Sequence, residues 1–147
     1  MKIISFLISV TTCMLITGCS TPGKEIIKKE KSEFNLYISI YDSDIDTPEN
    51  DRRCYYMVYI NKLDSGRTTT GLESQKKQFE TVLPVNRHLI KVEKWILNEN
   101  LGRYVKMNNI DQPKPDFIYI NIEEDKVVRV NLKSSKSGTA FYSVIAE

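Results

Sequence analysis

Most of the chain consists of short stretches in which apolar and polar side chains alternate. Such a two-residue period places every second side chain on one face, as in a half-buried strand. The stretches are residues 34–40, 54–60, 79–83, 90–96, 118–122, 128–132 and 140–145. A helix is possible only around residues 71–77, where it would be short. The chain after about residue 33 is therefore predicted to be nearly all strand.

The breaks between these stretches indicate how the strands connect. Glu123, Glu124 and Asp125 separate two of them and predict a hairpin turn. Lys94 interrupts an apolar face, which predicts a β-bulge or a sheet edge there. Seven or eight short strands favour an all-β fold, specifically an antiparallel β-sandwich of the immunoglobulin-like or transthyretin-like type.

Composition and charge narrow the class of protein. The 147 residues are 41% hydrophobic and 27% charged, which is typical of a globular domain. With 21 basic and 19 acidic residues the net charge is +2, which excludes a disordered acidic tail and the basic surface of a nucleic-acid-binding protein. No apolar run reaches the roughly 20 residues needed to span a bilayer.

The N-terminal segment has the pattern of an export signal. Lys2 supplies a basic start, and the apolar stretch over residues 3–16 is too short for a transmembrane helix. It ends in Leu15-Ile16-Thr17-Gly18-Cys19, which resembles the lipobox of bacterial lipoproteins. The resemblance implies cleavage before Cys19 and attachment of diacylglycerol to its sulfur, so that acyl chains anchor the protein to a membrane. The alternative is a plain secretory signal with an accidental cysteine.

The lipobox divides the chain into three parts. These are a signal peptide over residues 1–18, a lipidated N-terminus with a flexible tether over residues 19–32, and a domain over residues 33–147. The tether would hold the domain about 20 Å from the lipid. Ser20 follows the cysteine, where an aspartate would favour retention, and the family resemblance therefore implies transfer to the outer membrane.

The three cysteines leave no intramolecular disulfide bond in the mature protein. Cys13 leaves with the signal and Cys19 carries lipid, so Cys54 is the thiol that remains. Because Cys54 shares a predicted strand face with Val58, we expect a buried, unreactive thiol; an intermolecular bridge is the alternative. Cys54 and the only histidine, His88, are too few to build a zinc site.

The middle of the chain resembles a family of small envelope domains. Tyr56-Met57-Val58-Tyr59-Ile60-Asn61-Lys62 is followed by Gly66-Arg67-Thr68-Thr69, by residues 79–84 and by His88-Leu89-Ile90-Lys91-Val92. This succession is similar to PEGA-type domains over residues 53–94, with Asn86 where those domains favour glycine. The resemblance implies a transthyretin-like or immunoglobulin-like sandwich without catalytic residues.

Motifs that could support catalysis are sparse. Ser74-Gln75-Lys76-Lys77 fits Ser-x-x-Lys, and Lys136-Ser137-Gly138-Thr139 is similar to the Lys-Thr-Gly element of penicillin-binding proteins. Those enzymes hold the serine on a large helical domain, which this chain is too short to build. A lone His88 after a turn is expected to hydrogen-bond that turn. We therefore predict a protein that is not an enzyme, with no catalytic residue and no cofactor.

The densest acidic cluster offers a metal-binding alternative. Asp42, Asp44 and Asp46 alternate in the manner of calcium loops, where hard oxygens converge on the cation. Thr47 and Arg53 stand where an EF-hand needs its glycine and its final glutamate. A solvated loop is the simpler interpretation, and a calcium or small-ligand site over residues 42–51 is the alternative function.

Tyrosines provide the candidate binding surface. Tyr55, Met57 and Tyr59 share one face of a predicted strand, and Tyr37 and Tyr41 lie on the polar face of another. Such side chains are favoured at protein interfaces, although tyrosine also simply suits sheet surfaces. The sequence thus predicts a bacterial envelope protein, anchored to the outer membrane through Cys19, whose domain binds a protein partner without catalysis.

Overall fold

The structure, a computed structural model, describes residues 33–135 and 140–147, which belong to one compact unit. This part of the chain is almost entirely β-structure, with one turn of 3-10 helix. No helix among the described residues is long and apolar enough to cross a membrane. The elements are β1 (Leu36–Asp42), η1 (Pro48–Asn50), β2 (Arg53–Ile60), β3 (Leu63–Arg67), β4 (Gly71–Leu72), β5 (Lys77–Thr81), β6 (Asn86–Asn98), β7 (Arg103–Lys106), β8 (Ile118–Ile122), β9 (Val128–Ser134) and β10 (Ala140–Ala146).

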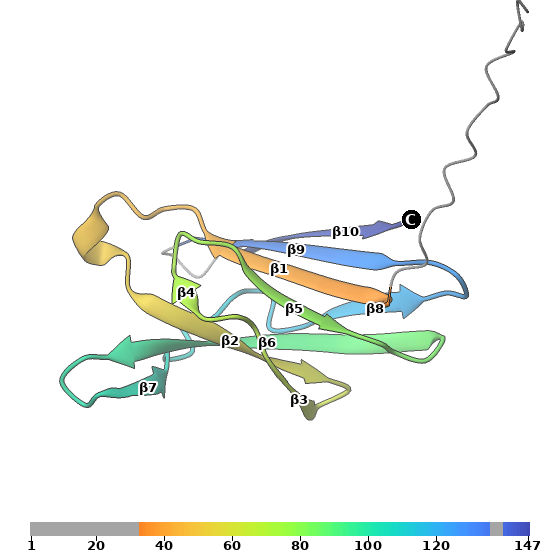
Figure 1. The fold of residues 1–147 in the computed structure, drawn as a ribbon, viewed down its shortest axis with the longest axis horizontal. Coiled ribbons are helices and arrows are strands. Elements are labelled where there is room, and N and C mark those ends of the chain that lie inside the picture. Colours follow the sequence, from red (N-terminus) through yellow and green to blue (C-terminus); the bar gives the residue numbers. More distant parts are fainter. Residues whose placement is uncertain (1–32, 136–139) are drawn as a thin grey trace, which may run out of the picture. The chain divides into compact units, whose positions relative to one another are not determined.

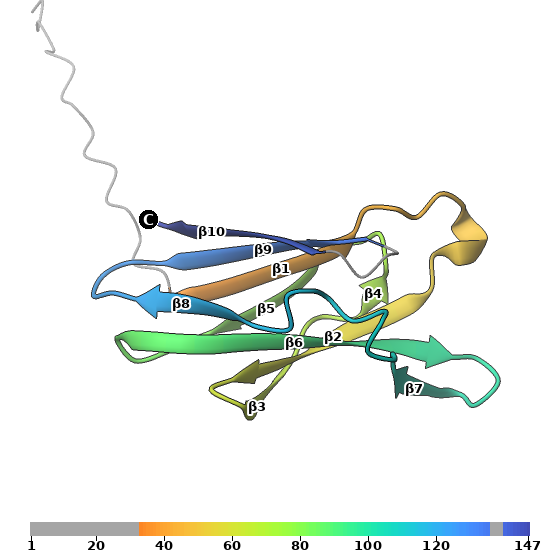
Figure 2. The same ribbon diagram turned by 180° about the vertical axis from the view of Figure 1, so that it is seen from behind.

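Two sheets lie face to face and form a sandwich (Figures 1 and 2). The four-stranded sheet has the order β10-β9-β1-β5, and the six-stranded sheet has the order β3-β2-β6-β7, with β4 also on β2 and β8 also on β6. Neighbouring strands are antiparallel except β1 and β9, which run parallel from Leu36 opposite Val128 to Asp42 opposite Ser134. The predicted β-sandwich is therefore confirmed, with ten strands among the described residues.

The core fills the space between the sheets because side chains alternate along each strand. In β1 and β9 every second residue is buried, as the sequence pattern predicts. Most of these inward positions are branched aliphatic side chains, whose burial is the main favourable contribution to folding. They are Leu36, Ile38, Ile40, Val58, Ile60, Ile90, Val92, Ile96, Ile120, Ile122, Val128, Val130 and Leu132.

The hairpin predicted at residues 123–125 is wrong, and the short helix that was possible around residues 71–77 does not form. Residues 123–125 do not close a hairpin, because β8 pairs with β6 in one sheet and β9 pairs with β1 and β10 in the other. The polar segment instead crosses from sheet to sheet. Residues 71–77 form no helix; β4 is followed by a turn and then by the start of β5. The side chain of Lys77, the first residue of β5, is buried inside the sandwich and does not lie on a helix face.

Three short strands, β3, β4 and β7, were not predicted from the alternation of apolar and polar residues. β3 reads Leu-Asp-Ser-Gly-Arg, and β4 and β7 are too short to show a period. The turn before β3 consists of Asn61 and Lys62, both with positive φ, which suits the twist of a two-residue hairpin. At Gly66, where φ is +121°, the pairing of β2 with β3 shifts register. By contrast, Asn86 begins β6 and is not among the residues of positive φ.

Lys94 does not produce a bulge. The pairing of β6 with β2 runs without a shift past Lys94, which lies opposite Tyr56. On its other side, β6 has no strand neighbour at this point, which fits the alternative of a sheet edge, because the pairing with β8 stops at Ile90 and the pairing with β7 starts at Trp95. The side chain of Gln112 fills the gap: Lys94 N donates to Gln112 Oε1 (2.7 Å), and Gln112 Nε2 donates to Lys94 O (3.2 Å). An amide side chain thus replaces a missing strand.

Candidate functional site

The predicted partner-binding residues lie on the outer face of the six-stranded sheet. Tyr55, Met57 and Tyr59 share that face of β2, as expected, and stand opposite Trp95, Glu93 and Lys91 of β6. On the far side of β6, Lys106 of β7 pairs with Trp95, and Tyr104 pairs with Leu97. We call the set Tyr55, Met57, Tyr59, Trp95 and Tyr104 the aromatic face.

Tyr55 forms the packed centre of the aromatic face. Its ring stacks on Trp95 with centroids 6.1 Å apart and planes within 8°, and Tyr104 tilts against it at 4.9 Å. The guanidinium of Arg67 lies 5.2 Å from the Tyr55 ring centroid, within range of a cation–π interaction. Only 8% of Tyr55 is exposed. Tyr55 therefore mainly holds its neighbours in place, and little of its own ring is accessible to a partner.

Met57 and Tyr59 remain half-buried beside a compact charged group. Glu93 Oε1 accepts from Lys91 Nζ at 2.7 Å and from Lys106 Nζ at 2.8 Å. Burial alone would raise the pKa of Glu93, but hydrogen bonds from Lys106 and Lys91 outweigh it and hold the pKa below its usual value. One carboxylate thus shares two ammonium groups, so this trio has a net positive charge.

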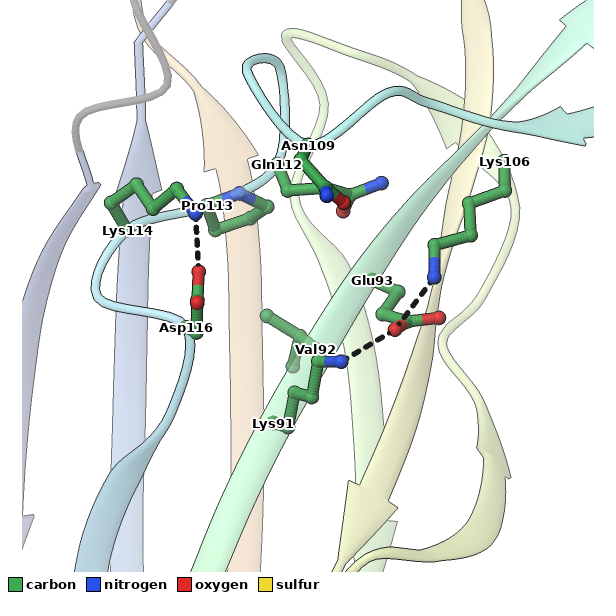
Figure 3. A pocket seen from close by; sticks show the side chains of 9 residues that line it. All are labelled: Lys91, Val92, Glu93, Lys106, Asn109, Gln112, Pro113, Lys114 and Asp116. Carbon is green, nitrogen blue, oxygen red and sulfur yellow. Dashed lines mark hydrogen bonds and ion pairs between the residues drawn. The ribbon is translucent and has the colours of Figure 1, made fainter.

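A recess of about 250 Å³ opens next to this charged trio (Figure 3). Its floor is β6 and its far wall is the segment between β7 and β8, where Gln112 also donates to Met107 O at 2.8 Å. The polar lining suits a hydrogen-bonding or charged side chain of a partner better than an apolar ligand. The lining residues are Lys91, Val92, Glu93, Lys106, Asn109, Gln112, Pro113, Lys114 and Asp116.

Tyr37 and Tyr41 do not extend the aromatic face. They lie on the outer face of β1, in the four-stranded sheet, on the opposite side of the sandwich. Tyr37 packs under the guanidinium of Arg129, 4.6 Å from its ring centroid, beside polar neighbours of β5 and β9. The two tyrosine-bearing strands therefore present separate surfaces.

The acidic cluster is divided between the core and the surface. Asp42 ends β1 facing inward, where Oδ2 accepts from Lys94 Nζ at 2.7 Å and from the Tyr56 hydroxyl at 3.3 Å. Asp44 is exposed and accepts from the Ser43 hydroxyl, 2.8 Å away. Among the described residues, no three histidine, cysteine, aspartate or glutamate side chains are placed to hold one metal ion. The structure does not bring Asp42, Asp44 and Asp46 together as a calcium loop would require.

Asp42 instead belongs to a buried ion network that the sequence pattern did not predict. Lys94 Nζ also contacts Glu73 Oε1 at 2.6 Å, and Arg52 Nε donates to Glu73 Oε2 at 3.2 Å. Burial alone would lower the pKa of Lys94, but Asp42 and Glu73 raise it above its usual value. The only sign of this network in the sequence is Lys94, a lysine within an apolar strand face. Such a lysine is also what a buried ion pair would place there.

Lys77 and Ser74, which fit the Ser-x-x-Lys pattern, each hydrogen-bond to other groups. The Lys77 ammonium is fully buried and donates to the carbonyls of Leu72, Glu73 and Gln75, at 2.6, 2.9 and 2.6 Å. The Ser74 hydroxyl donates to Asp51 at 2.6 Å. Burial lowers the pKa of Lys77. These contacts fix the β4–β5 turn against the sandwich, and residues 136–139, the other half of the motif, lie outside the described residues.

Cys54 and His88 have the environments that the sequence predicts. Cys54 is fully buried, and burial raises its pKa to about 11, so its thiolate is suppressed at neutral pH. His88 Nε2 lies 2.9 Å from the carbonyl of Pro84, and Nδ1 lies 3.0 Å from the Asn61 amide nitrogen. Because a carbonyl only accepts, Nε2 holds the proton and Nδ1 accepts from Asn61. His88 therefore joins two turns.

The lipidation candidate Cys19, the signal over residues 1–18 and the tether over residues 19–32 lie outside the described residues. Comparison of the chain with protein-family models, with curated proteins and with solved structures found no match.

Proposed function

We propose that this chain is a lipid-anchored protein of the bacterial envelope whose domain is a non-enzymatic interaction module. It binds a protein partner through the aromatic face and the adjoining recess, while lipid on Cys19 holds it at the outer membrane. The proposal rests on the grouping of the half-buried Met57 and Tyr59 with the stacked Tyr55 and Trp95 on one outer sheet face.

The chemistry of this face supports binding to a protein. Tyrosine, tryptophan, methionine and arginine are the side chains enriched at interfaces, because each buries a large area with little polar cost. Here Tyr55 already packs against Trp95 and against Arg67 in the absence of a partner. A surface that is already ordered loses little conformational entropy on binding. The charged lysines around Glu93 then supply a polar rim.

Anchoring strengthens such a surface without adding contacts. A protein held near a membrane meets other envelope proteins at a raised effective concentration, so that moderate affinity is sufficient. Two or three acyl chains give stable attachment, since each buried methylene contributes about 0.8 kcal/mol. The lipobox resemblance of residues 15–19 supports this part of the proposal.

The binding surface is tested by crosslinking and affinity capture of the full-length protein from its own cells. The test variant is Met57→Ser with Tyr59→Ser, which removes half-buried side chains and leaves the packed Tyr55 in place. The matched control is Tyr37→Ser with Tyr41→Ser on the opposite outer face. We expect the first pair to lose a partner that the wild type and the control both retain. Equal loss from both pairs, or from neither, would refute the aromatic face as the binding surface.

The anchor is tested separately by metabolic labelling with an alkyne fatty acid. We expect label on the wild-type protein and none on Cys19→Ala, which should also stay at the size of the unprocessed chain. Label that persists on Cys19→Ala would contradict the anchor while leaving the binding surface untouched.

A further inference from the structure

Strand β10 is an edge strand without the usual protection against pairing. It ends the four-stranded sheet, and only β9 pairs with it among the described residues. Its sequence, Ala-Phe-Tyr-Ser-Val-Ile-Ala, contains no charged residue and no proline. Long edges of this kind pair readily with another strand, and proteins normally protect them with charges, prolines or bulges.

The edges formed by β3, β7 and β5 show such protection. β3 contains Asp64 and Arg67 and a register shift, and β7 is only four residues long with Arg103 at its start. The outer edge of β5 is occupied, since Thr69 N donates to the carbonyl of Gln78 at 2.9 Å. Among the described residues, the edge of β10 therefore differs from these three; β8, Ile-Tyr-Ile-Asn-Ile, is a shorter edge strand that also has no charged residue.

Both faces of β10 also expose apolar side chains. Val144 pairs with Val130, which is buried, so Val144 faces the space between the sheets; even so, 48% of it is exposed. Ile145, on the other face, is 45% exposed. At Val144 the inward face of β10 thus lies past the part of the core that is covered, whereas Tyr142 on the same face packs against the core. An additional strand beside β10 would cover Val144.

The hydrogen bonds to β9 determine which backbone groups remain at the free edge. Glu147 and Val127 exchange N–H···O bonds of 3.0 Å in both directions, so the backbone groups of Ile145 and Ser143 also point toward β9. Those of Tyr142 and Val144 therefore point outward. Consistently, Val128, which pairs with Ala146, donates away from β10, to the carbonyl of Asn35.

This arrangement is self-complementary about Ser143. If a second copy pairs antiparallel with its own β10, Tyr142 stands opposite Val144 of that copy, and each presents outward backbone groups to the other. Ser143 then faces Ser143 of the second copy in a non-hydrogen-bonded pair. No charged residues stand opposite one another, and Val144 gains Tyr142 of the second copy as a cross-strand neighbour on the core side.

We propose that two copies of this chain associate through β10, antiparallel about Ser143, joining their four-stranded sheets into one continuous sheet. The partner is a second copy rather than an unrelated strand because the same seven residues supply matching apolar positions and matching backbone groups from both sides. This surface is distinct from the aromatic face, which stays open in the pair because it belongs to the other sheet.

Disulfide crosslinking of the full-length protein in native membranes tests the proposal. A non-hydrogen-bonded pair brings its Cα atoms to about 4.5 Å, at the short end of the range of disulfide bonds. Ser143→Cys should therefore yield a reducible dimer under mild oxidation, whereas the wild type, whose Cys54 is buried, should not. The matched control is Asn131→Cys, which is exposed and paired with Ser143 one strand further in.

We expect about tenfold more dimer from Ser143→Cys than from Asn131→Cys, because only the former is held at the two-fold axis. Adding Val144→Lys should abolish the crosslink, whereas adding Asn131→Lys should preserve it. Comparable crosslinking of both cysteine variants would mean random collision and would overturn the proposal. A Ser143→Cys crosslink to a different protein would equally overturn it, since the edge would then serve an unrelated strand.

Discussion

The space between the two sheets contains two regions of different chemistry. Over most of its length the inward side chains of β1, β6, β8 and β9 are aliphatic. Near the end of β1 the same inward positions hold charged groups instead, with Asp42, Glu73, Lys77 and Lys94 all buried. Apolar packing is sufficient for the first region. The second region is stable only if each buried charge has a partner.

The two regions show that alternation determines the direction of a side chain and not its chemistry. In β1, Asp42 continues the inward series of Leu36, Ile38 and Ile40. In β6, Lys94 continues the inward series of Ile90 and Val92. A charge at an inward position of one strand is therefore a reason to look for an opposite charge at an inward position of another.

Removing the central cation should have the largest effect. Lys94→Met removes the ion-pair partner of the buried Asp42, which keeps the hydrogen bond from the Tyr56 hydroxyl, and leaves Glu73 with the half-exposed Arg52. Breaking a buried ion pair from one side costs about 3–5 kcal/mol. We expect a loss of this size in the free energy of unfolding, measured by urea denaturation of the purified full-length protein.

A compensating variant distinguishes lost pairing from lost packing. Combining Lys94→Met with Asp42→Asn and Glu73→Gln removes the uncompensated charges and should restore much of the stability. If the triple variant is no more stable than Lys94→Met alone, the charged region owes its stability to side-chain shape and not to ion pairing.

Removing the hydroxyl of Tyr56 should have the next largest effect. Tyr56 is fully buried, and its hydroxyl lies 3.2 Å and 3.3 Å from the two carboxylate oxygens of Asp42. Hydrogen bonds to charged groups contribute about 1.5–3 kcal/mol. Because Lys94 still pairs with Asp42, Tyr56→Phe should lie near the lower end of that range in the same urea experiment. A loss as large as that of Lys94→Met would show that Tyr56, and not Lys94, is the main partner of Asp42.

Much of the fold could be predicted because the two-residue alternation of its strands is visible in the sequence. All seven alternating stretches correspond to strands, and Cys54 and His88 have their expected environments. The connection through residues 123–125 could not be predicted, because a polar break has the same composition whether the next strand returns to the same sheet or crosses to the other. Short strands such as β7 depend on their neighbours and show no pattern of their own.

The candidate site was only partly predictable for a related reason. The shared face of Tyr55, Met57 and Tyr59 follows from their spacing along one strand. That Trp95 stacks on Tyr55 depends on the pairing register of β2 with β6, which the two-residue period does not determine. The contact of Asp42 with Lys94 joins residues far apart in the sequence, and so only the tertiary fold reveals it.

A conservative change in the aliphatic region should reduce stability less than the changes in the charged region. Ile38 is 2% exposed and packs among aliphatic neighbours. Ile38→Val removes one methylene group and should cost about 1 kcal/mol, well below the effect of Lys94→Met. Thermal or urea denaturation would measure it. A cost above that of Lys94→Met would reverse the ranking of the two regions and show that the ion network is peripheral to stability.

The smallest effect should be a dependence of the folding stability on pH, which only the charged region should show. Burial alone would raise the pKa of Glu73, but hydrogen bonds from Arg52 and Lys94 outweigh it, so its pKa in the folded protein lies below the usual value of 4.5. Glu73 therefore contributes stability above that usual value and loses it as the pH falls through the lower folded pKa. Part of the contribution is screened, since Arg52 is half exposed. Between about pH 6 and pH 3, the stability of the wild type relative to Glu73→Gln should shrink as the pH falls, whereas that relative to Ile38→Val should stay constant. A difference from Glu73→Gln that does not change with pH would mean that Glu73 is not stabilised as a carboxylate, and that the network acts through packing alone.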